Sequence, residues 1–403
     1  MISAVILFVT LFGLNQVIFS GFQKKHSFFS TSLMHKLYWY HLFFVGVYYT
    51  YALFNNSDSK KYYLRPQDES MGWLDHFGTS TTFVDFFSYP FINGLFLSYE
   101  AMMLLYGYLG FLGFVFSYLF FRENIPIKIK VFKRFDFLLL LLFLPNMHFW
   151  TASLGKGAPI FLGLMMFAYA IKKPNRRVFL LILSSLIIYF IRPHVFLFVA
   201  AGTVLGYMSG REKIQLWKKI LVFGIMIGGV IAVQDQILGM ANLEGSDDLV
   251  SDFEDFSEGR ADSLAKKGSG VDMSNYSLPF KLFTFWFRPL FIDAPGILGL
   301  ITSVENLIYL LLFGKIFQKG FIKFIRNSPV AVKMSIVIFL LSSFALTFVM
   351  SNLGIIMRQK SQVMYFAFFV IYYFVAQKKY DRIIARRKKA AKLRQLSEIQ
   401  TNI

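Results

Sequence analysis

Long apolar runs separated by short charged segments recur along this 403-residue chain, and they constrain its fold more than any other feature. A helix that spans a bilayer needs about 20 apolar residues, somewhat fewer when it is buried in a bundle. Hydrophobic residues make up 56% of the chain and its mean hydropathy is +0.53, above the range of soluble domains. The pattern predicts an all-α, polytopic membrane bundle of eleven helices, at about 2–19, 37–53, 99–121, 137–150, 160–171, 178–191, 195–208, 220–239, 297–313, 331–350 and 363–376.

Basic residues are enriched in every second connecting segment. Of the 42 lysines and arginines, 29 lie in one alternating set, which comprises 20–36, 122–135, 172–177, 209–219, 314–327 and the tail after 377. The opposite segments hold most of the acids, and cytoplasmic loops of membrane proteins are enriched in Lys and Arg. We therefore expect an outside N-terminus and a cytoplasmic C-terminus, with a single transmembrane bundle over 1–376 and a basic tail over 377–403.

The two ends of the chain carry their own signals. The first apolar run has no positive charge before it and is followed by Lys24 and Lys25, so it predicts a retained helix rather than a secretory signal. The tail from Lys378 to Arg394 is typical of a cytoplasmic helix that rests on anionic lipid. Nucleic acid is disfavoured as a partner despite the net charge of +19, because the charge lies in loops and forms no stripe.

Cysteine is absent, which excludes disulfides, thiolate catalysis and cysteine-ligated metals. No spacing of His, Asp and Glu predicts a bound metal ion, although a divalent metal stays open because external carboxylates are plentiful. We expect no cofactor.

Two of the expected external segments are long, about 54–98 and about 240–296. The second begins with Gly, Ser and acidic residues, a composition typical of a mobile loop. It ends in LPFKLFTFWFRPLFIDAPG, whose aromatic crowding favours a helix in the outer interface that stops at Pro289. Neither segment is long enough to bury the core of a soluble domain.

A polar run from Leu144 to Ile160, LPNMHFWTASLGKGAPI, lies between two apolar segments. The segments 137–150 and 178–191 correspond to only about 21 Å of helix, against a hydrocarbon core of about 30 Å. Unless these helices extend into the polar linkers that follow them, the linkers must lie below the outer surface, as re-entrant-like segments that line a wet cavity or are buried in protein. We expect an outward cavity with Lys156 and Arg192 in its wall, because ionisable groups at membrane depth are usually functional.

Other unusual polar residues fall on the same expected outer side. Several cations that converge on an apolar cavity suit a phosphate or pyrophosphate, and a nearby carboxylate would supply a general base. The predicted phosphate-binding residues are Lys156, Arg192, His194, Arg260, Arg288, Arg358 and Lys360. The candidate catalytic residues are Asp75, Asp85, Glu258 and His148.

Each of these residues also has a plainer interpretation. His148 lies in an aromatic run and fits an interfacial cluster equally well. Lys156 fits a side chain that snorkels to outer headgroups. Arg192, before a proline, fits a helix stop whose guanidinium meets lipid phosphate, and the acids of 244–258 fit a solvated loop. It is their location on one side of the membrane that favours a shared site.

Three motifs resemble those of a known group of membrane enzymes. The run PNMHFWTASLGKGAPIFLGL at 145–164 is similar to the proline–aromatic–Gly-Lys segment of GT-C-type membrane glycosyltransferases and of bacterial O-antigen and capsule polymerases. RPH at 192–194 and NLGIIMRQKSQ at 352–362 resemble their later outer-face motifs. The chain departs from the GT-C pattern in its expected outside N-terminus and in lacking a tight acidic pair in the first long external segment.

The resemblance implies a glycosyltransferase or polysaccharide polymerase that acts on polyprenyl-phosphate-linked sugars at the external face of a bacterial inner membrane. In this hypothesis a carboxylate deprotonates the acceptor and the cations stabilise the departing pyrophosphate. The partners would be the lipid-linked saccharide and membrane lipid. A second hypothesis is a translocator of lipid-linked saccharide, which would require polar residues at full depth and related halves. A third is membrane acyl transfer with His148 as the base.

Overall fold

The protein is almost entirely helical. The computed structural model describes residues 2–401, apart from 213–214, 218, 221–222, 225–226, 230, 232–258, 260, 262, 265, 267–268 and 274. Helix accounts for 79% of the structure. The strands β1 (Lys130–Val131) and β2 (Phe135–Asp136) form a short antiparallel hairpin. The all-α class expected from the sequence is confirmed.

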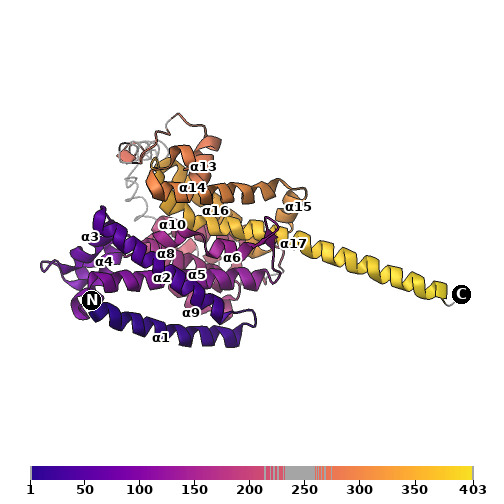
Figure 1. The fold of residues 1–403 in the computed structure, drawn as a ribbon, viewed down its shortest axis with the longest axis horizontal. Helices are drawn as coiled ribbons and strands as arrows, with labels where there is room; N and C mark the ends of the chain where they lie inside the picture. Colours follow the sequence, from indigo (N-terminus) through magenta and orange to yellow (C-terminus); the bar gives the residue numbers. More distant parts are fainter. Residues whose placement is uncertain are drawn as a thin grey trace.

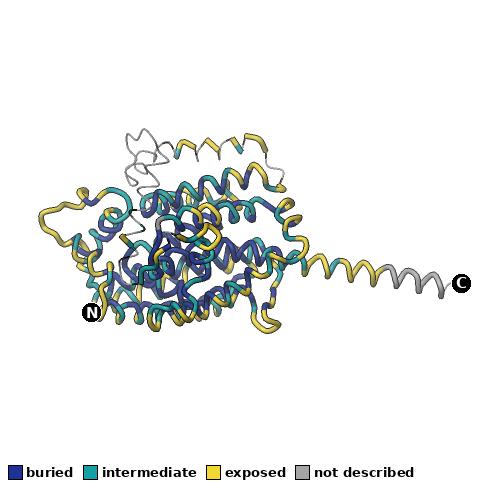
Figure 2. The backbone as a smooth tube through the Cα atoms, turned by 90° about the horizontal axis from the view of Figure 1, so that it is seen from above, coloured by how far each residue is buried: buried dark blue, intermediate teal, exposed yellow. Residues whose placement is uncertain are grey.

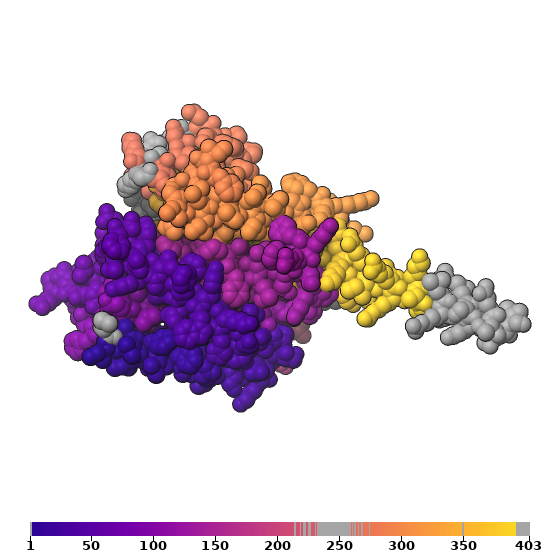
Figure 3. Space-filling view, viewed as in Figure 1, coloured from indigo at the N-terminus to yellow at the C-terminus, as the bar shows by residue number. Residues whose placement is uncertain are grey.

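Three helices form the buried centre of the bundle, and other helices surround them (Figures 1 and 2). The central helices are α5 (Tyr99–Asn124), α8 (Gly157–Ala170) and α17 (Leu353–Thr401). The surrounding helices are α1 (Ile2–Lys25), α2 (Thr31–Phe54), α9 (Val178–Ile191), α10 (Pro193–Ser209), α14 (Gly296–Phe313) and α16 (Val330–Val349). Figure 3 shows α1 and α2 in indigo on one side and α14 in orange on the opposite side.

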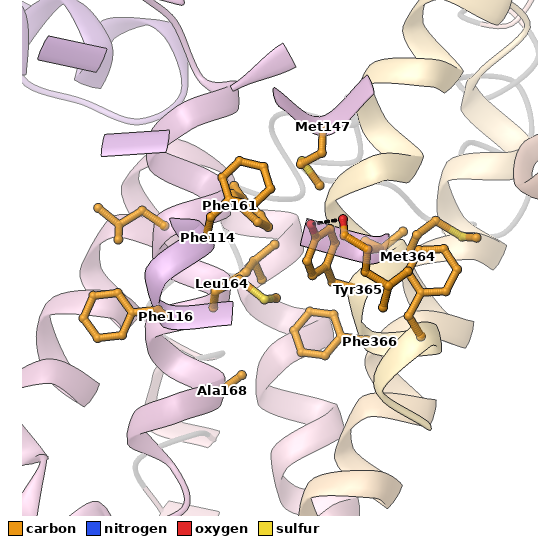
Figure 4. Packing of buried hydrophobic residues seen from close by; sticks show 14 of the residues in the cluster. Phe114, Phe116, Met147, Phe161, Leu164, Ala168, Met364, Tyr365 and Phe366 are labelled. Carbon is orange, nitrogen blue, oxygen red and sulfur yellow. Dashed lines mark hydrogen bonds between the residues drawn. The ribbon is translucent and has the colours of Figure 1, made fainter. Parts of the chain in front are cut away.

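The centre is close-packed by aromatic rings and small residues. Gly113 of α5 faces α8, where an added Cβ would lie 2.5 Å from a ring carbon of Phe161. The Phe161 ring lies 4.9 Å from Phe114 and 5.2 Å from Tyr365, measured between centroids (Figure 4). The Tyr365 hydroxyl donates to the Leu141 carbonyl oxygen at 3.1 Å. Close approach of backbones at small residues, filled in by large rings, is typical of helix packing in membranes.

Four helices are long and apolar enough to cross a membrane. They are Ile2–Lys25, Tyr99–Asn124, Gly296–Phe317 and Val330–Phe348. Of the apolar window in the first helix, only 17% is buried inside the protein, and Ile2, Val5, Ile6 and Val9 are all exposed. α9 and α14 also expose rows of apolar side chains, which would be costly in water and are favourable against lipid. These features indicate a membrane protein.

One of the expected spans is broken in two. The segment 137–150 forms α6 (Phe137–Leu142) and α7 (Pro145–Trp150), with a break at Phe143 and Leu144. Pro145 lacks an N–H group and restricts the residue before it to extended backbone, so α6 cannot continue into α7. The α9 bounds match the expected segment 178–191, whereas most of the expected span 220–239 lies outside the described residues.

The last helix is much longer than the sequence suggested. Residues 363–376 were expected as one short span, but α17 runs without interruption from Leu353 to Thr401. Its first half is buried in the bundle, and its basic second half projects from the body (Figure 1). The charged pair Arg358 and Lys360 concealed the start of this helix in the sequence. Lys360 has polar partners inside the bundle, and Arg358 lies beside Asp58.

The segment 54–98, expected as an external loop, is folded into helical turns. Ser57 caps α3 through its hydroxyl, which accepts from the Ser59 amide at 3.3 Å. The turns are α3 (Asp58–Leu64), η1 (Arg65–Gln67), η2 (Trp73–His76), α4 (Thr81–Tyr89) and η3 (Pro90–Gly94). They pack on one another and on α5, so this segment has a fixed position beside the bundle.

The described part of the segment 240–296 includes the expected aromatic helix, α13 (Leu278–Phe287), which ends just before Pro289. The Trp286 indole donates to the Ser343 hydroxyl of α16 at 2.9 Å, so α13 is anchored to the bundle. The remaining short elements are η4 (Pro174–Arg176), η5 (Phe291–Asp293), η6 (Gly314–Phe317) and α15 (Phe321–Arg326).

Hydrogen bonds near the ends of the helices divide the connecting segments into two groups. In one group, the Ser80 amide donates to the Phe190 carbonyl oxygen at 2.6 Å, and Val271 and Ser351 are hydrogen-bonded at 2.9 Å. In the other group, Lys379 donates to the Lys128 carbonyl oxygen at 2.9 Å. The second group contains the segments rich in lysine and arginine. We refer to the end with the Ser80–Phe190 and Val271–Ser351 contacts as the cavity end, after the cavity described below. The end with the Lys379–Lys128 contact is the basic end.

Candidate functional site

The loop between α7 and α8, residues 151–156, is held tightly against α5. An added Cβ at Gly110 of α5 would overlap the Thr151 carbonyl oxygen, and one at Gly157 would overlap the Trp150 carbonyl oxygen. Gly155 has φ +150°, a conformation that side chains other than glycine rarely adopt. These glycines fix the loop so that the Lys156 ammonium reaches Ser80, to which it donates a hydrogen bond at 2.6 Å.

A cavity of about 430 Å³ opens at this loop. Its wall combines the α7–α8 loop, the α9–α10 turn, the start of α17 and the segment 58–81. The charged and aromatic lining residues are Tyr48, Asp58, Lys61, Tyr62, Arg65, Trp150, Lys156, Arg192, His194 and Arg358. Four of the residues predicted from the sequence therefore lie together: Lys156, Arg192, His194 and Arg358.

Arg192 is almost completely buried, with 6% of its surface exposed. It precedes Pro193, which starts α10, and its guanidinium donates to the Gln359 side-chain oxygen. Its Nε, like the Nε of Arg358, is buried and has no hydrogen-bond partner among the described residues. An unpaired buried donor is costly, so these two atoms are available to donate to a bound anion.

Positive charge exceeds negative charge in the cavity wall. Five lysines or arginines line it, whereas Asp58 is the one carboxylate among its lining residues in the described part of the chain. Asp58 lies 3.5 Å from Arg358 and its side chain is 62% exposed. Burial, and then the charges of Arg192 and Arg358, lower the pKa of Lys156 to about 8. The cavity is therefore suited to an anion.

Arg65 is oriented by a carboxylate behind the cavity wall. Its Nε and Nη2 donate to the two oxygens of Asp85 at 2.6 and 3.0 Å, a bidentate arrangement that fixes the guanidinium plane. The guanidinium also lies over the Tyr62 ring, 4.7 Å from its centroid. Asp85, one of the predicted bases, is buried and both of its oxygens are occupied, so it positions Arg65 and does not line the cavity.

Two other predicted catalytic residues lie outside the cavity lining. Asp75 is exposed, and its carboxylate accepts from the Gly72 amide at 2.7 Å within a local turn. His148 is fully buried and stacks on Phe114 with ring centroids 3.9 Å apart. Its Nε2 bonds the Leu142 carbonyl oxygen at 2.7 Å and its Nδ1 lies 2.8 Å from Nδ1 of His41. The aromatic packing interpretation accounts for its position.

Arg288 and Lys360 belong to a second polar cluster beside the cavity. The Lys360 ammonium is fully buried and donates to the Arg288 carbonyl oxygen and to the Asn306 side-chain oxygen, both at 2.7 Å. The Arg288 side chain pairs with Asp293. Neither residue is among those that line the cavity. The remaining predictions, Glu258 and Arg260, lie outside the described residues.

Glu305, in the middle of α14, is a buried carboxylate that the sequence reasoning missed. It accepts from the Asn146 amide at 2.5 Å and from the Tyr309 hydroxyl at 2.8 Å. Asn146 in turn accepts from the Trp150 indole at 3.1 Å, which connects Glu305 to the cavity wall. The signal was present, since Glu305 is the single charged residue in the apolar run 296–313.

Asp58, Lys61 and Arg65 were also missed, because their segment was expected to be an external loop. Their local signal is Ser57 followed by an acid and two lysines, a sequence typical of a helix start. Among the described residues, no group of three or more His, Asp or Glu is arranged to hold a metal ion. The geometry thus offers an anion site made of cations and aromatic rings.

The chain matches no protein-family model, no curated protein sequence and no solved structure.

Proposed function

We propose that this protein is a membrane glycosyltransferase or polysaccharide polymerase whose cationic cavity holds the phosphate or pyrophosphate of a lipid-linked sugar. The observation that carries the proposal is the buried Nε atoms of Arg192 and Arg358, which have no partner among the described residues, in a wall with five cations. A lipid-linked sugar combines an apolar tail, a charged linker and a polar saccharide. A bundle of apolar helices with a cationic cavity at one end is complementary to all three parts.

The leaving group interacts with three cations. Arg192 and Arg358 donate to the phosphate oxygens, and Lys156 adds a point charge. These groups act when the bond between the sugar and the phosphate lengthens, because negative charge then accumulates on the phosphate. Binding in a site with little water strengthens each of these interactions.

Asp58 is the general base in this proposal, because it lines the cavity, whereas Asp75 and Asp85 do not. It removes the proton of an acceptor hydroxyl, whose oxygen then forms a bond to the anomeric carbon of the donor sugar. The bond from that carbon to the phosphate oxygen breaks, and its electron pair leaves with the lipid pyrophosphate. The aromatic rings of Trp150, Tyr48 and Tyr62 in the same wall provide surfaces for sugar rings.

The cavity end faces outward in this proposal. The support is the excess of lysine and arginine at the basic end, which the positive-inside rule assigns to the cytoplasm. The membrane would be the bacterial cytoplasmic membrane. Because the chain has no cysteine, Lys156→Cys and Arg192→Cys variants give unambiguous labelling with a membrane-impermeant maleimide. Labelling of intact cells is the expected result, and labelling only after the cytoplasmic side is exposed would overturn the topology.

Activity is tested with purified protein, a polyprenyl-pyrophosphate oligosaccharide and detection of two products, the elongated saccharide and the free polyprenyl pyrophosphate. Both products are expected from the unmodified chain. Arg192→Ala and Arg358→Ala are expected to form both products at least about a hundredfold more slowly, at unchanged protein abundance. Normal polymer formation by both variants would refute the proposal.

Translocation of a lipid-linked saccharide is the second candidate. It is favoured by the buried Glu305, an ionisable group near the middle of a membrane-length helix. A translocator would move the intact substrate between leaflets of a proteoliposome without releasing polyprenyl pyrophosphate. The same product assay therefore separates the two candidates.

A further inference from the structure

A second cavity, of about 270 Å³, lies at the basic end between α15 and α17. Its lining residues are Lys319, Gly320, Lys323, Phe324, Asn327, Phe374, Gln377, Lys378 and Asp381. We refer to it as the basic-end cavity. None of its residues is shared with the cationic cavity described above, so the two can be tested separately.

The depth of the basic-end cavity is set by the helices that end beside it. The membrane-length helix Gly296–Phe317 ends just before Lys319, and the next one, Val330–Phe348, begins just after Asn327. On α17, the uncharged run that follows Lys360 ends at Gln377. Three apolar helical runs thus stop at the residues that line this cavity. This is the level at which lipid headgroups meet the hydrocarbon core.

The wall of this cavity is cationic over an aromatic floor. Lys319, Lys323 and Lys378 supply three positive charges, and Asp381 is the one carboxylate among its lining residues in the described chain. The Lys378 ammonium donates to the Gln318 side-chain oxygen at 3.0 Å and lies 5.2 Å from the centroid of Phe374. These contacts direct it along the floor and not into open solvent.

Apolar side chains beside the cavity have no protein partner to bury them. Phe317 is 85% exposed and Ile322 is 64% exposed, on either side of Lys319. In a bilayer these side chains enter the region of the acyl chains, while the lysines stay with the headgroups. The same patch thus has one surface for acyl chains and another for an anion.

We propose that the basic-end cavity binds the headgroup of an anionic phospholipid. The lipid phosphate lies between the lysines of α15 and Lys378, and its acyl chains lie along Phe317 and Ile322. Asp381 accepts a hydrogen bond from a headgroup hydroxyl, so the preferred lipid carries a hydroxylated headgroup such as glycerol. This site is independent of the proposed enzymatic activity.

The test is native mass spectrometry of the full chain in detergent, titrated with dioctanoyl phosphatidylglycerol or dioctanoyl phosphatidylcholine. The unmodified protein is expected to retain the glycerol lipid in preference. The double variant Lys319→Gln, Lys323→Gln is expected to bind it roughly thirtyfold more weakly, since each lysine near an anionic lipid contributes about 1 kcal/mol. The matched control is Lys130→Gln, Lys133→Gln, which removes the same charge from the exposed β1–β2 hairpin at the same end.

Three outcomes would overturn the proposal. Equal loss of lipid binding in the Lys319/Lys323 double variant and in the Lys130/Lys133 control would show that the lipid responds only to overall charge. Equal retention of the two lipids would show that the headgroup is not recognised. Binding of glycerol phosphate as tightly as the lipid would reveal a site for free anions. The Asp381→Asn variant tests the role of the headgroup hydroxyl. It should weaken the binding of phosphatidylglycerol and leave the binding of phosphatidic acid unchanged.

Discussion

Positive side chains gather at both ends of the bundle, but the two clusters are built differently. At the basic end, Arg177 donates to both oxygens of Glu123 at 2.8 and 2.9 Å, and Lys173 lies 2.6 Å from the same carboxylate. The Arg177 guanidinium also covers the Tyr169 ring at 3.6 Å. At the cavity end, the buried Nε atoms of Arg192 and Arg358 have no partner in the described part of the chain.

The difference separates a structural cluster from a binding site. Around Glu123 both carboxylate oxygens accept hydrogen bonds from the Arg177 guanidinium, which joins the end of α5 to the start of α9. Around Lys156 five cations face one carboxylate, and the Nε atoms of Arg192 and Arg358 lack a partner in the described part of the chain, so an anion would complete their hydrogen bonds. The number of cations does not distinguish the two ends. The number of hydrogen-bond acceptors available to those cations does.

The largest effect is expected from removing a cation of the cavity. Arg192→Ala deletes a buried guanidinium that, in the proposed reaction, stabilises the leaving pyrophosphate, so turnover should fall by about a hundredfold to a thousandfold. The measurement is release of polyprenyl pyrophosphate by purified protein.

The matched change at the basic end is Arg177→Ala, which removes the guanidinium that is paired with Glu123. At a temperature where this variant is folded, turnover should stay within about twofold of the unmodified protein. Comparable losses in both folded variants would remove the distinction between the two ends.

The second prediction concerns Asp58. Asp58→Asn keeps the size of the side chain but removes the proposed base, and turnover should fall by about a hundredfold. Because the side chain is 62% exposed, the free energy of unfolding should change by less than about 0.5 kcal/mol. Asp58→Glu should restore part of the activity. Full activity of Asp58→Asn would transfer the role of base to another carboxylate.

The third prediction is that a change at the basic end lowers stability without lowering turnover. Glu123→Gln leaves Arg177 and Lys173 without their shared carboxylate, and the free energy of unfolding should fall by about 3 kcal/mol. Thermal unfolding in detergent measures the loss, and turnover per folded molecule should be unchanged. Unaltered thermal stability would show that this cluster is not the structural counterpart we describe.

The smallest effect is a dependence on pH. Lys156 in the free cavity has a pKa of about 8, so it is protonated below that pH and neutral above it. An anion binds the protonated form, hence affinity for a short prenyl pyrophosphate should fall roughly tenfold between about pH 7 and pH 9. Calorimetric titration measures this slope. Lys156→Arg stays charged over that range and should bind with little dependence on pH; an unchanged slope would assign the effect to another group.

The fold class was predictable from the sequence because long apolar runs form helices whatever the later packing of those helices. Two boundaries were missed for local reasons. Pro145 lies inside an apolar run whose length alone indicated one helix, and the polar residues at 358–362 of α17 looked like a loop. Lys360 and Gln359 are accommodated in a helix because Asn306 and Arg192 supply their partners, which only the tertiary structure reveals.

The site was predicted in part. Lys156, Arg192, His194 and Arg358 stood out because charge is rare next to apolar runs, and the structure brings them together. Asp58 did not stand out, since an acid in a polar segment is ordinary. Asp75 and Asp85 differ from it only in where their turns fold, and this information is not carried by their neighbours in the sequence.

The continuity of α17 has a consequence for the membrane that surrounds the protein. Arg358 in the cationic cavity and Lys378 in the basic-end cavity are separated by about 30 Å of straight helix, close to the thickness of a hydrocarbon core. The helix therefore sets a hydrophobic length. A bilayer of matching thickness holds both cavities at headgroup level at once, whereas a thicker one draws one of them toward the acyl chains or tilts the bundle. If both cavities lie at headgroup level as proposed, a bilayer of another thickness would cost fractions of a kcal/mol for each Å of mismatch.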